Sequence, residues 1–148
     1  MRQLLTITSL LLVCMAGIGH AEEVYVNMDR IMQIESGGNP NAYNASSKAT
    51  GLYQITPIVL KDFNQTMLKI PGYDNTYKQA DLYDPQINAK IAHWYMNTRI
   101  PSLFKAYKLV DSVDHRLVAY NAGIRAVIRN LRPKETRDYI VKYHKGDL

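Results

Sequence analysis

The sequence contains a single cysteine, and this scarcity of thiols excludes several classes of site. Cys14 lies in an apolar run from residue 4 to residue 18 (LLTITSLLLVCMAGI). If that run is removed during export, the mature chain can form no disulfide, no thiolate metal site and no cysteine nucleophile. The sequence also lacks the HExxH, P-loop and nucleophile-elbow patterns. It therefore gives no indication of a zinc-peptidase, nucleotide-hydrolase or serine-esterase mechanism.

Residues 1–21 have the features of a secretory signal that is cleaved before Glu22. Arg2 provides a positive start, the apolar run follows, and Gly19-His20-Ala21 places small residues at both positions that a signal peptidase requires. The alternative is a retained membrane anchor, although the run is short for a membrane span. We expect export, a periplasmic location and a mature domain that covers residues 22–148.

Acidic residues are fewer than basic ones. The chain has 13 Asp and Glu against 18 Lys and Arg, a net charge of +5, and removal of Arg2 with the signal leaves +4. A basic protein favours anionic partners such as cell wall, lipid headgroups and nucleic acid. The basic residues are scattered along the sequence, without the Arg/Lys block or interleaved aromatics of a nucleic-acid module. We therefore expect no nucleic-acid partner, and charge alone does not choose among the others.

The alternating pattern of β-strands is nearly absent, and apolar residues instead recur at helical spacing. Only the segment 51–55 is short enough for a small hairpin arm, and the polar stretch 69–81 is expected to be a loop. The sequence predicts a single, mainly α domain with at most a small hairpin. Its expected helices run from about residue 28 to Gly37, from Pro57 past Met67, from Pro85 to an end or bend at Pro101, from about Ser112 to Ala122, and from near Pro133 to about Tyr143.

Glu35 is the most informative polar residue, because it continues an apolar helical face. Met28, Ile31 and Met32 precede it at helical spacing, and Gly37 ends the helix just after it. Burial penalises the charged form of a carboxyl, and the C-terminal end of a helix disfavours negative charge. Both effects raise the pKa of Glu35, and a glutamic acid that keeps its proton near neutrality can act as a general acid. The alternative is a glutamate that points into solvent.

Four motifs follow one another along nearly the whole mature chain. They are Glu35-Ser36 with Asn39-Pro40 and Gly51-Leu52-Tyr53-Gln54; Asp84-Pro85-x-x-Asn88 with Tyr95; Ala119-Tyr120-Asn121-Ala122-Gly123; and Glu135-Thr136-Arg137-x-Tyr139. In this order they resemble the lytic transglycosylases of the soluble-lytic type. That family has a goose-lysozyme-like fold, so the resemblance implies a helical domain with a groove for peptidoglycan glycan strands.

The resemblance implies roles for the residues of the first motif. Glu35 is expected to protonate the oxygen that bridges two sugars. Ser36 is expected to cap or orient the segment after it, and Gln54 to hydrogen-bond the sugar beside the cleaved bond. Amide and hydroxyl groups suit sugar hydroxyls and N-acetyl groups. Gln54 could instead be an ordinary exposed residue.

Three residues of the later motifs are expected to complete the site. Tyr120 and Asn121 would line the groove, and Tyr139 would reach Glu35 and fix its orientation. Each has a structural alternative: Tyr120 and Tyr139 could be core residues, and Asn121 could cap a helix end.

The sequence departs from the family pattern at three places. Ile124-Arg125 follows Asn-Ala-Gly where members usually carry Pro-Gly, so this turn and the final helix could be displaced. The usual serine between Asn-Pro and Gly-Leu-x-Gln could be Ser46 or Ser47, and Ala92 replaces an expected helix glycine. None of these changes affects Glu35.

The sequence favours a mechanism that uses a single carboxylate. Glycosidases usually use two carboxylates, and we assign no second acidic residue to any of the matched motifs. The possible second carboxylates are suggested by composition alone, and they are Asp62, Asp74, Asp81 and Asp84. The resemblance implies that Glu35 serves both proton transfers, that the N-acetyl group of the substrate assists, and that a 1,6-anhydro ring forms. We expect a monomer that needs no metal or organic cofactor.

Two other functions stay open at this stage. A lysozyme-type hydrolase on the same fold would use water in place of the C6 hydroxyl. A non-catalytic peptidoglycan-binding or assembly module would keep the groove but has no need of a carboxyl on an apolar face. Small members of the family often serve secretion, conjugation or pilus machinery or phages, so components of such an envelope apparatus are expected partners.

Overall fold

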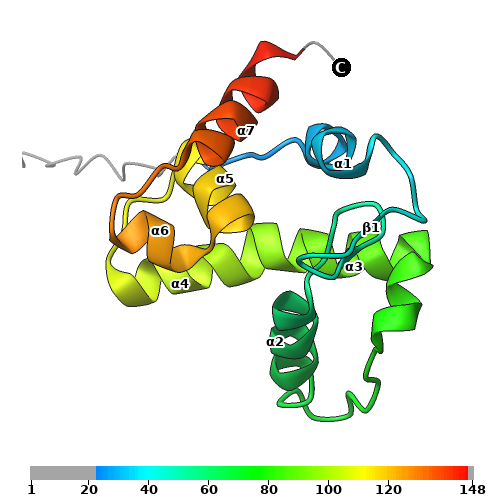
Figure 1. The fold of residues 1–148 in the computed structure, drawn as a ribbon. Coiled ribbons are helices and arrows are strands. Elements are labelled where there is room, and N and C mark those ends of the chain that lie inside the picture. The colour runs from blue at the N-terminus through cyan, green and yellow to red at the C-terminus, as the bar shows by residue number, and fades with distance from the viewer. Residues whose placement is uncertain (1–22, 147–148) are drawn as a thin grey trace, which may run out of the picture.

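The computed structural model describes residues 23–146, and the expected signal at residues 1–21 lies outside this part of the chain. The described residues include seven α-helices, a short 3₁₀ helix, a π turn and one two-stranded sheet. A long helical rod crosses the molecule, with α5, α6 and α7 over one end and the sheet and α2 near the other (Figure 1). The prediction of a mainly α fold with a small hairpin is confirmed. No helix within residues 23–146 has the length and apolar content needed to cross a membrane.

The helices begin where short polar side chains cap them. Asn27, Thr56, Asp84 and Ser112 each accept a hydrogen bond from a backbone N–H in the first turn that follows, and proline takes an early position in α2 and α3. The helices are α1 (Met28–Ser36), α2 (Pro57–Met67), α3 (Pro85–Trp94), α4 (Ile100–Tyr107), α5 (Val113–Ala122), α6 (Ile124–Ile128) and α7 (Lys134–Lys145).

Two local predictions were wrong in detail. The hairpin pairs β1 (Tyr43–Asn44) with β2 (Ala49–Thr50), and residues 51–55 instead form a turn that returns to Thr50 through a bridge with Ile55. The expected loop at 69–81 ends in a short 3₁₀ helix, η1 (Gln79–Tyr83). Each strand is two residues long and η1 is five residues long. Elements of this length contain too few residues for a periodic pattern in the sequence.

Pro101 does not end the third helix. A π turn, η2 (Tyr95–Arg99), joins α3 to α4, and the backbone N–H of Ile100 bonds to the carbonyl of Tyr95. Proline cannot donate the usual helical hydrogen bond, and a wider turn before it is one way to continue the helix. The rod in Figure 1 is therefore α3, η2 and α4 in succession.

The core forms where the rod meets the other helices. Ile31 of α1, Phe63 of α2, Met96 of the π turn and Leu117 of α5 are almost completely buried. They belong to one cluster that also includes Tyr139 and Tyr143 of α7. Helices from the two ends of the chain, α1 and α7, are thus joined through the same core.

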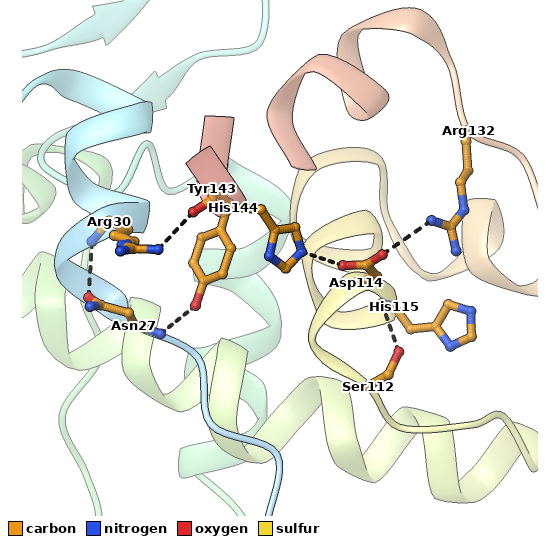
Figure 2. A network of polar contacts seen from close by, with 8 residues as sticks. All are labelled: Asn27, Arg30, Ser112, Asp114, His115, Arg132, Tyr143 and His144. Atoms are coloured by element: carbon orange, nitrogen blue, oxygen red, sulfur yellow. Dashed lines mark hydrogen bonds and ion pairs between the residues drawn. The ribbon is translucent and has the colours of Figure 1, made fainter. Parts of the chain in front are cut away.

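The last turns of α7 are tied to α1 and α5 by polar contacts (Figure 2). The backbone N–H of Asn27 donates to the Tyr143 hydroxyl at 2.7 Å, and Arg30 donates to the Tyr143 carbonyl at 3.1 Å. His144 Nε2 lies 2.7 Å from Asp114 Oδ1 at the start of α5. These contacts fix α7, the helix that carries Tyr139.

Asn88 of α3 holds the turn after β2 in place. Its side chain is fully buried, accepts from the backbone N–H of Tyr53, and donates to the carbonyls of Thr50 and Leu82 at 2.8 Å each. Gly51 lies against this amide with φ +80°, and a Cβ there would come within 2.2 Å of Asn88 Nδ2 and 2.3 Å of the Leu82 carbonyl oxygen. Only glycine fits such a close approach at positive φ.

Gly51→Ala is therefore expected to destabilise the fold by about 3 kcal/mol or more, because strain and overlap add. Gly72→Ala is a matched control, since Gly72 has the same φ of +80° and nothing within 4 Å of its added Cβ. The free energy of unfolding of the control should fall by only about 1–2 kcal/mol, because its left-handed backbone is strained by any side chain. Urea unfolding of both variants measures the difference, and equal losses would show that the contact with Asn88 is unimportant.

Candidate active site

Glu35 lies in the last turn of α1 and lines a hollow of about 520 Å³ between α1 and α7. Ile34 of α1 and Asn121 of α5 border the same hollow. The remaining lining residues all come from α7: Lys134, Glu135, Asp138, Tyr139 and Lys142. The N-terminal motif and the C-terminal motif, about 100 residues apart in sequence, therefore meet at one site.

Tyr139 holds the Glu35 carboxyl directly. Its hydroxyl donates to Glu35 Oε1 at 2.8 Å, and its ring is buried on the inner face of α7. Thr136, one turn earlier on that face, donates to Asn121 Oδ1 at 2.8 Å. α7 is thus attached to α5 just beside the residue that contacts Glu35.

The surroundings of Glu35 favour its protonated form. Burial, partly opposed by the hydrogen bond from Tyr139 and assisted by the nearby charge of Glu135, raises the pKa of Glu35 from 4.5 to about 7. The carboxyl also lies at the C-terminal end of α1, where the helix dipole acts in the same direction. A carboxyl with a pKa close to neutrality can both give a proton and take one.

The sequence reasoning on a second carboxyl overlooked Glu135. This residue opens the fourth motif, and it shares the hollow with Glu35, as Asp138 does. Asp138 is paired with Lys134 at 2.6 Å. The expectation that no motif carries a second acidic residue was therefore wrong, because Glu135 of the fourth motif lines the hollow with Glu35.

Ser36 and Gln54 both bind the backbone of the β-hairpin region. Ser36 donates to the Leu52 carbonyl at 2.7 Å and so orients the turn that carries Gln54. The Gln54 amide donates to the carbonyls of Gly51 and Ala42, at 3.1 and 3.3 Å, and Gln54 has a φ of +48°. These bonds position Gln54 on the hairpin side, and its contact with a sugar remains a prediction.

Tyr120 lies beneath the site, outside the lining of the hollow around Glu35. Its hydroxyl donates to the Tyr53 carbonyl at 2.8 Å, and its ring lies 5.8 Å from that of Tyr95. Burial and the nearby charge of Glu35 raise the pKa of Tyr120 well above its usual value. Tyr120 therefore supports the region between Glu35 and the turn at Tyr53, and its role in lining a groove stays a prediction.

The departures from the family pattern leave Glu35 and Tyr139 in contact. α6 begins directly after Gly123 and includes Ile124 and Arg125, so the altered turn is a short helix. Ser46 donates to Asn44 Oδ1 at 2.7 Å within the hairpin loop, and the backbone N–H of Ser47 bonds to the same oxygen. Both serines are exposed, and neither is distinguished as the family serine.

Two residues that organise the site carried no separate prediction. Asn88 holds the turn before Gln54, and Thr136 holds α7 against Asn121. Both are fully buried polar residues within the quoted motifs, and a polar residue at a fixed motif position was the available signal.

Known proteins share the part of the chain that forms this site. Residues 23–142 match the family model of the transglycosylase SLT domain. The chain belongs to the transglycosylase SLT family. The match includes Glu35, the hairpin, Asn88, Asn121 and Tyr139, so the SLT family covers every element that forms the hollow.

One curated relative is the membrane-bound lytic murein transglycosylase E of Buchnera aphidicola subsp. Baizongia pistaciae (strain Bp). It is 28% identical over 107 residues, which are 72% of this chain and 49% of that protein. The SLT-family chain described here thus spans about half the length of this relative. No solved structure gives a significant match.

Proposed function

We propose that this chain is a peptidoglycan lytic transglycosylase with Glu35 as its single acid and base. The observation that carries the proposal is the Glu35 carboxyl itself, which is held by Tyr139 at 2.8 Å in a hollow and has a pKa of about 7. Membership of the SLT family and the printed name of the relative support the choice of substrate. The bond cleaved is the β-1,4 bond between N-acetylmuramic acid and N-acetylglucosamine.

The reaction proceeds in two proton transfers. Glu35 first gives its proton to the bridging oxygen, and the bond from that oxygen to C1 of the muramic acid breaks. The carbonyl oxygen of the N-acetyl group of the substrate stabilises the positive charge that develops at C1. Glu35, now a carboxylate, then takes the proton of the C6 hydroxyl as its oxygen bonds to C1, and a 1,6-anhydro ring closes. No water is consumed, and Glu35 ends protonated.

The remaining site residues would hold the glycan and the catalytic carboxyl. Tyr139 keeps the Glu35 carboxyl at a fixed angle for both transfers, a geometry on which rates depend steeply. Asn121 borders the hollow and offers an amide to sugar hydroxyls, while Ser36 fixes the turn that presents Gln54. Tyr120 supports this turn through its bond to Tyr53.

The site of action would be the periplasm, after removal of residues 1–21. An enzyme of this kind there would open local gaps in the wall for a secretion, conjugation or pilus apparatus, or for a phage, and components of that apparatus would be its partners.

A lysozyme-type hydrolase is the second candidate, and Glu135 is the observation that favours it. Glu135 lines the hollow with Glu35, and among the described residues it is not paired with a cation as Asp138 is with Lys134. Glycosidases that use water normally have two carboxyls at the cleaved bond. The two reactions differ in their products, because an anhydro end is lighter than a reducing end by one water.

Mass spectrometry of purified cell wall digested by the full chain tests the proposal. Anhydro-ended fragments are expected as the main products. If all fragments have reducing ends, the chain is a hydrolase and not a transglycosylase. If the wall stays undigested, the result favours a binding module. Glu135→Gln should leave the anhydro products unchanged.

A further inference from the structure

Part of the positive charge of the chain gathers at one corner of the folded molecule. Residues 100–110 and 117–134 contain six Lys and Arg and no Asp or Glu, whereas the whole chain has a net charge of +5. The fold brings these two segments together, because α6 packs against α4 (Figure 1). Basic residues that lie in two separate segments of the sequence are therefore neighbours in the fold.

We define the basic corner by five residues on the end of α4 and on α6 with the loop after it: Lys105, Lys108, Arg125, Arg129 and Arg132. Within residues 23–146, only Arg132 of these five has an acidic partner, Asp114 at 3.9 Å. Asp111, the other acid nearby in sequence, is bonded by Arg116 at 2.7 and 2.8 Å. Four cations of the basic corner are thus left without a counterion from the described chain.

Exposed apolar side chains accompany these cations. Tyr107 ends α4 and Val110 follows it, and Ile128 ends α6 and Leu131 follows in the loop. Each of the four has between 44% and 70% of its surface exposed. Arg125 and Ile128 lie three residues apart on α6, and Arg129, Leu131 and Arg132 follow in the loop after it. Exposed cations and exposed apolar side chains therefore occur together at the end of α6 and in this loop.

We propose that the basic corner binds the surface of an anionic phospholipid membrane. Lys and Arg attract the headgroups, and neighbouring apolar side chains enter the boundary between headgroups and acyl chains. The long stems of Lys and Arg can lie along that boundary while their charges reach phosphate. A soluble anionic polymer would use the cations but not the apolar residues, and this difference favours the membrane.

The basic corner is separate from the hollow around Glu35, since none of its residues lines that hollow. It also includes the departure from the family pattern, because Ile124-Arg125 begins α6 and Arg125 is one of the five residues. Membrane binding would therefore leave Glu35 accessible, and it does not depend on the proposed reaction.

Partition of the full chain onto lipid vesicles tests the proposal. The binding free energy is measured on vesicles of phosphatidylcholine with about 30% phosphatidylglycerol and on vesicles of pure phosphatidylcholine. The value for the pure phosphatidylcholine vesicles is then subtracted from the value for the anionic ones. The subtraction removes the contribution of the apolar residues 4–18, which every variant shares. Each basic residue near an anionic surface strengthens binding about fivefold, so the double variant Arg125→Gln/Arg129→Gln should bind about 25-fold more weakly.

The matched control removes two exposed cations elsewhere. Lys61→Gln/Lys69→Gln makes the same change of net charge in α2 and the segment that follows it. It should weaken binding less than threefold. An equal loss in both double variants, or no preference of the unaltered chain for anionic vesicles, would overturn the proposal.

The apolar residues distinguish a membrane from a soluble polyanion. Ile128→Ser/Leu131→Ser should weaken binding to anionic vesicles at least threefold while leaving binding to soluble polyglutamate unchanged. If vesicle binding does not change, the corner is a polyanion site and the membrane assignment is wrong. Wall cleavage by the double variants should equal that of the unaltered chain, which confirms that they are folded.

Discussion

Glu35→Gln is expected to reduce cleavage of peptidoglycan by a factor of about 10² to 10⁴ or more. Glutamine has nearly the same size and can accept the hydrogen bond from Tyr139, but it can neither give a proton to the bridging oxygen nor take one from the C6 hydroxyl. Release of soluble fragments from purified wall, followed over time, measures the loss. Glu135→Gln is the matched control, because it removes a carboxyl from the same hollow and should keep activity within about tenfold.

The same substitution should make the fold more stable at alkaline pH. The pKa of Glu35 is about 7 in the folded chain against 4.5 ordinarily. The unaltered chain therefore loses stability as the pH rises from 4.5 to above 7, by up to about 3 kcal/mol. Glutamine does not titrate, so the variant should melt at a higher temperature at pH 8 and at a similar one near pH 4. An inactive variant that melts early at every pH would mean that activity was lost through unfolding.

Tyr139→Phe is expected to lower the rate of wall cleavage at least tenfold with little change in stability. The ring remains packed, and one hydrogen bond usually contributes only about 0.5–1.5 kcal/mol to folding. Without the hydroxyl, the Glu35 carboxyl is free to rotate away from the bridging oxygen. Because the bond from Tyr139 lowers the pKa of Glu35, its loss should also move the alkaline limit of activity to higher pH.

Tyr143→Phe provides the comparison for Tyr139→Phe. Tyr143 lies one turn further along α7, is equally buried, and its hydroxyl accepts a bond of 2.7 Å from the backbone of Asn27 (Figure 2). The two variants should melt at similar temperatures, but Tyr143→Phe should retain most of its activity. Equal activity in the two variants would mean that Tyr139 is only a core residue.

Features set by local sequence could be predicted. The caps at Thr56 and Asp84 and the apolar face that includes Ile31 and Glu35 depend on residues within a few positions of one another. Such interactions act before the fold is complete, so the sequence is sufficient to recognise them. The contact between Tyr139 and Glu35 was expected from the family resemblance, because no local pattern connects residues 104 positions apart.

Features that need distant segments to meet could not be predicted. Asn88 reaches the turn at Gly51, Glu135 shares the hollow with Glu35, and α6 joins α4 to form the basic corner. Asn88 and Glu135 stand in recognised motifs, but a motif does not say which segment its residue will contact, and each role follows from the packing of the helices. The continuation of the rod through Pro101 depends likewise on a π turn that the proline rule does not anticipate.

The titration of Glu35 tests most directly the claim that this carboxyl is the acid and base of the site. Carboxyl ¹³C NMR of the full chain labelled at glutamate can follow it, with the Glu35 signal identified by its absence in Glu35→Gln. A midpoint of about 7 is expected from burial at the end of α1. A midpoint near the ordinary 4.5 would show a solvated, ionised carboxylate and would contradict the account.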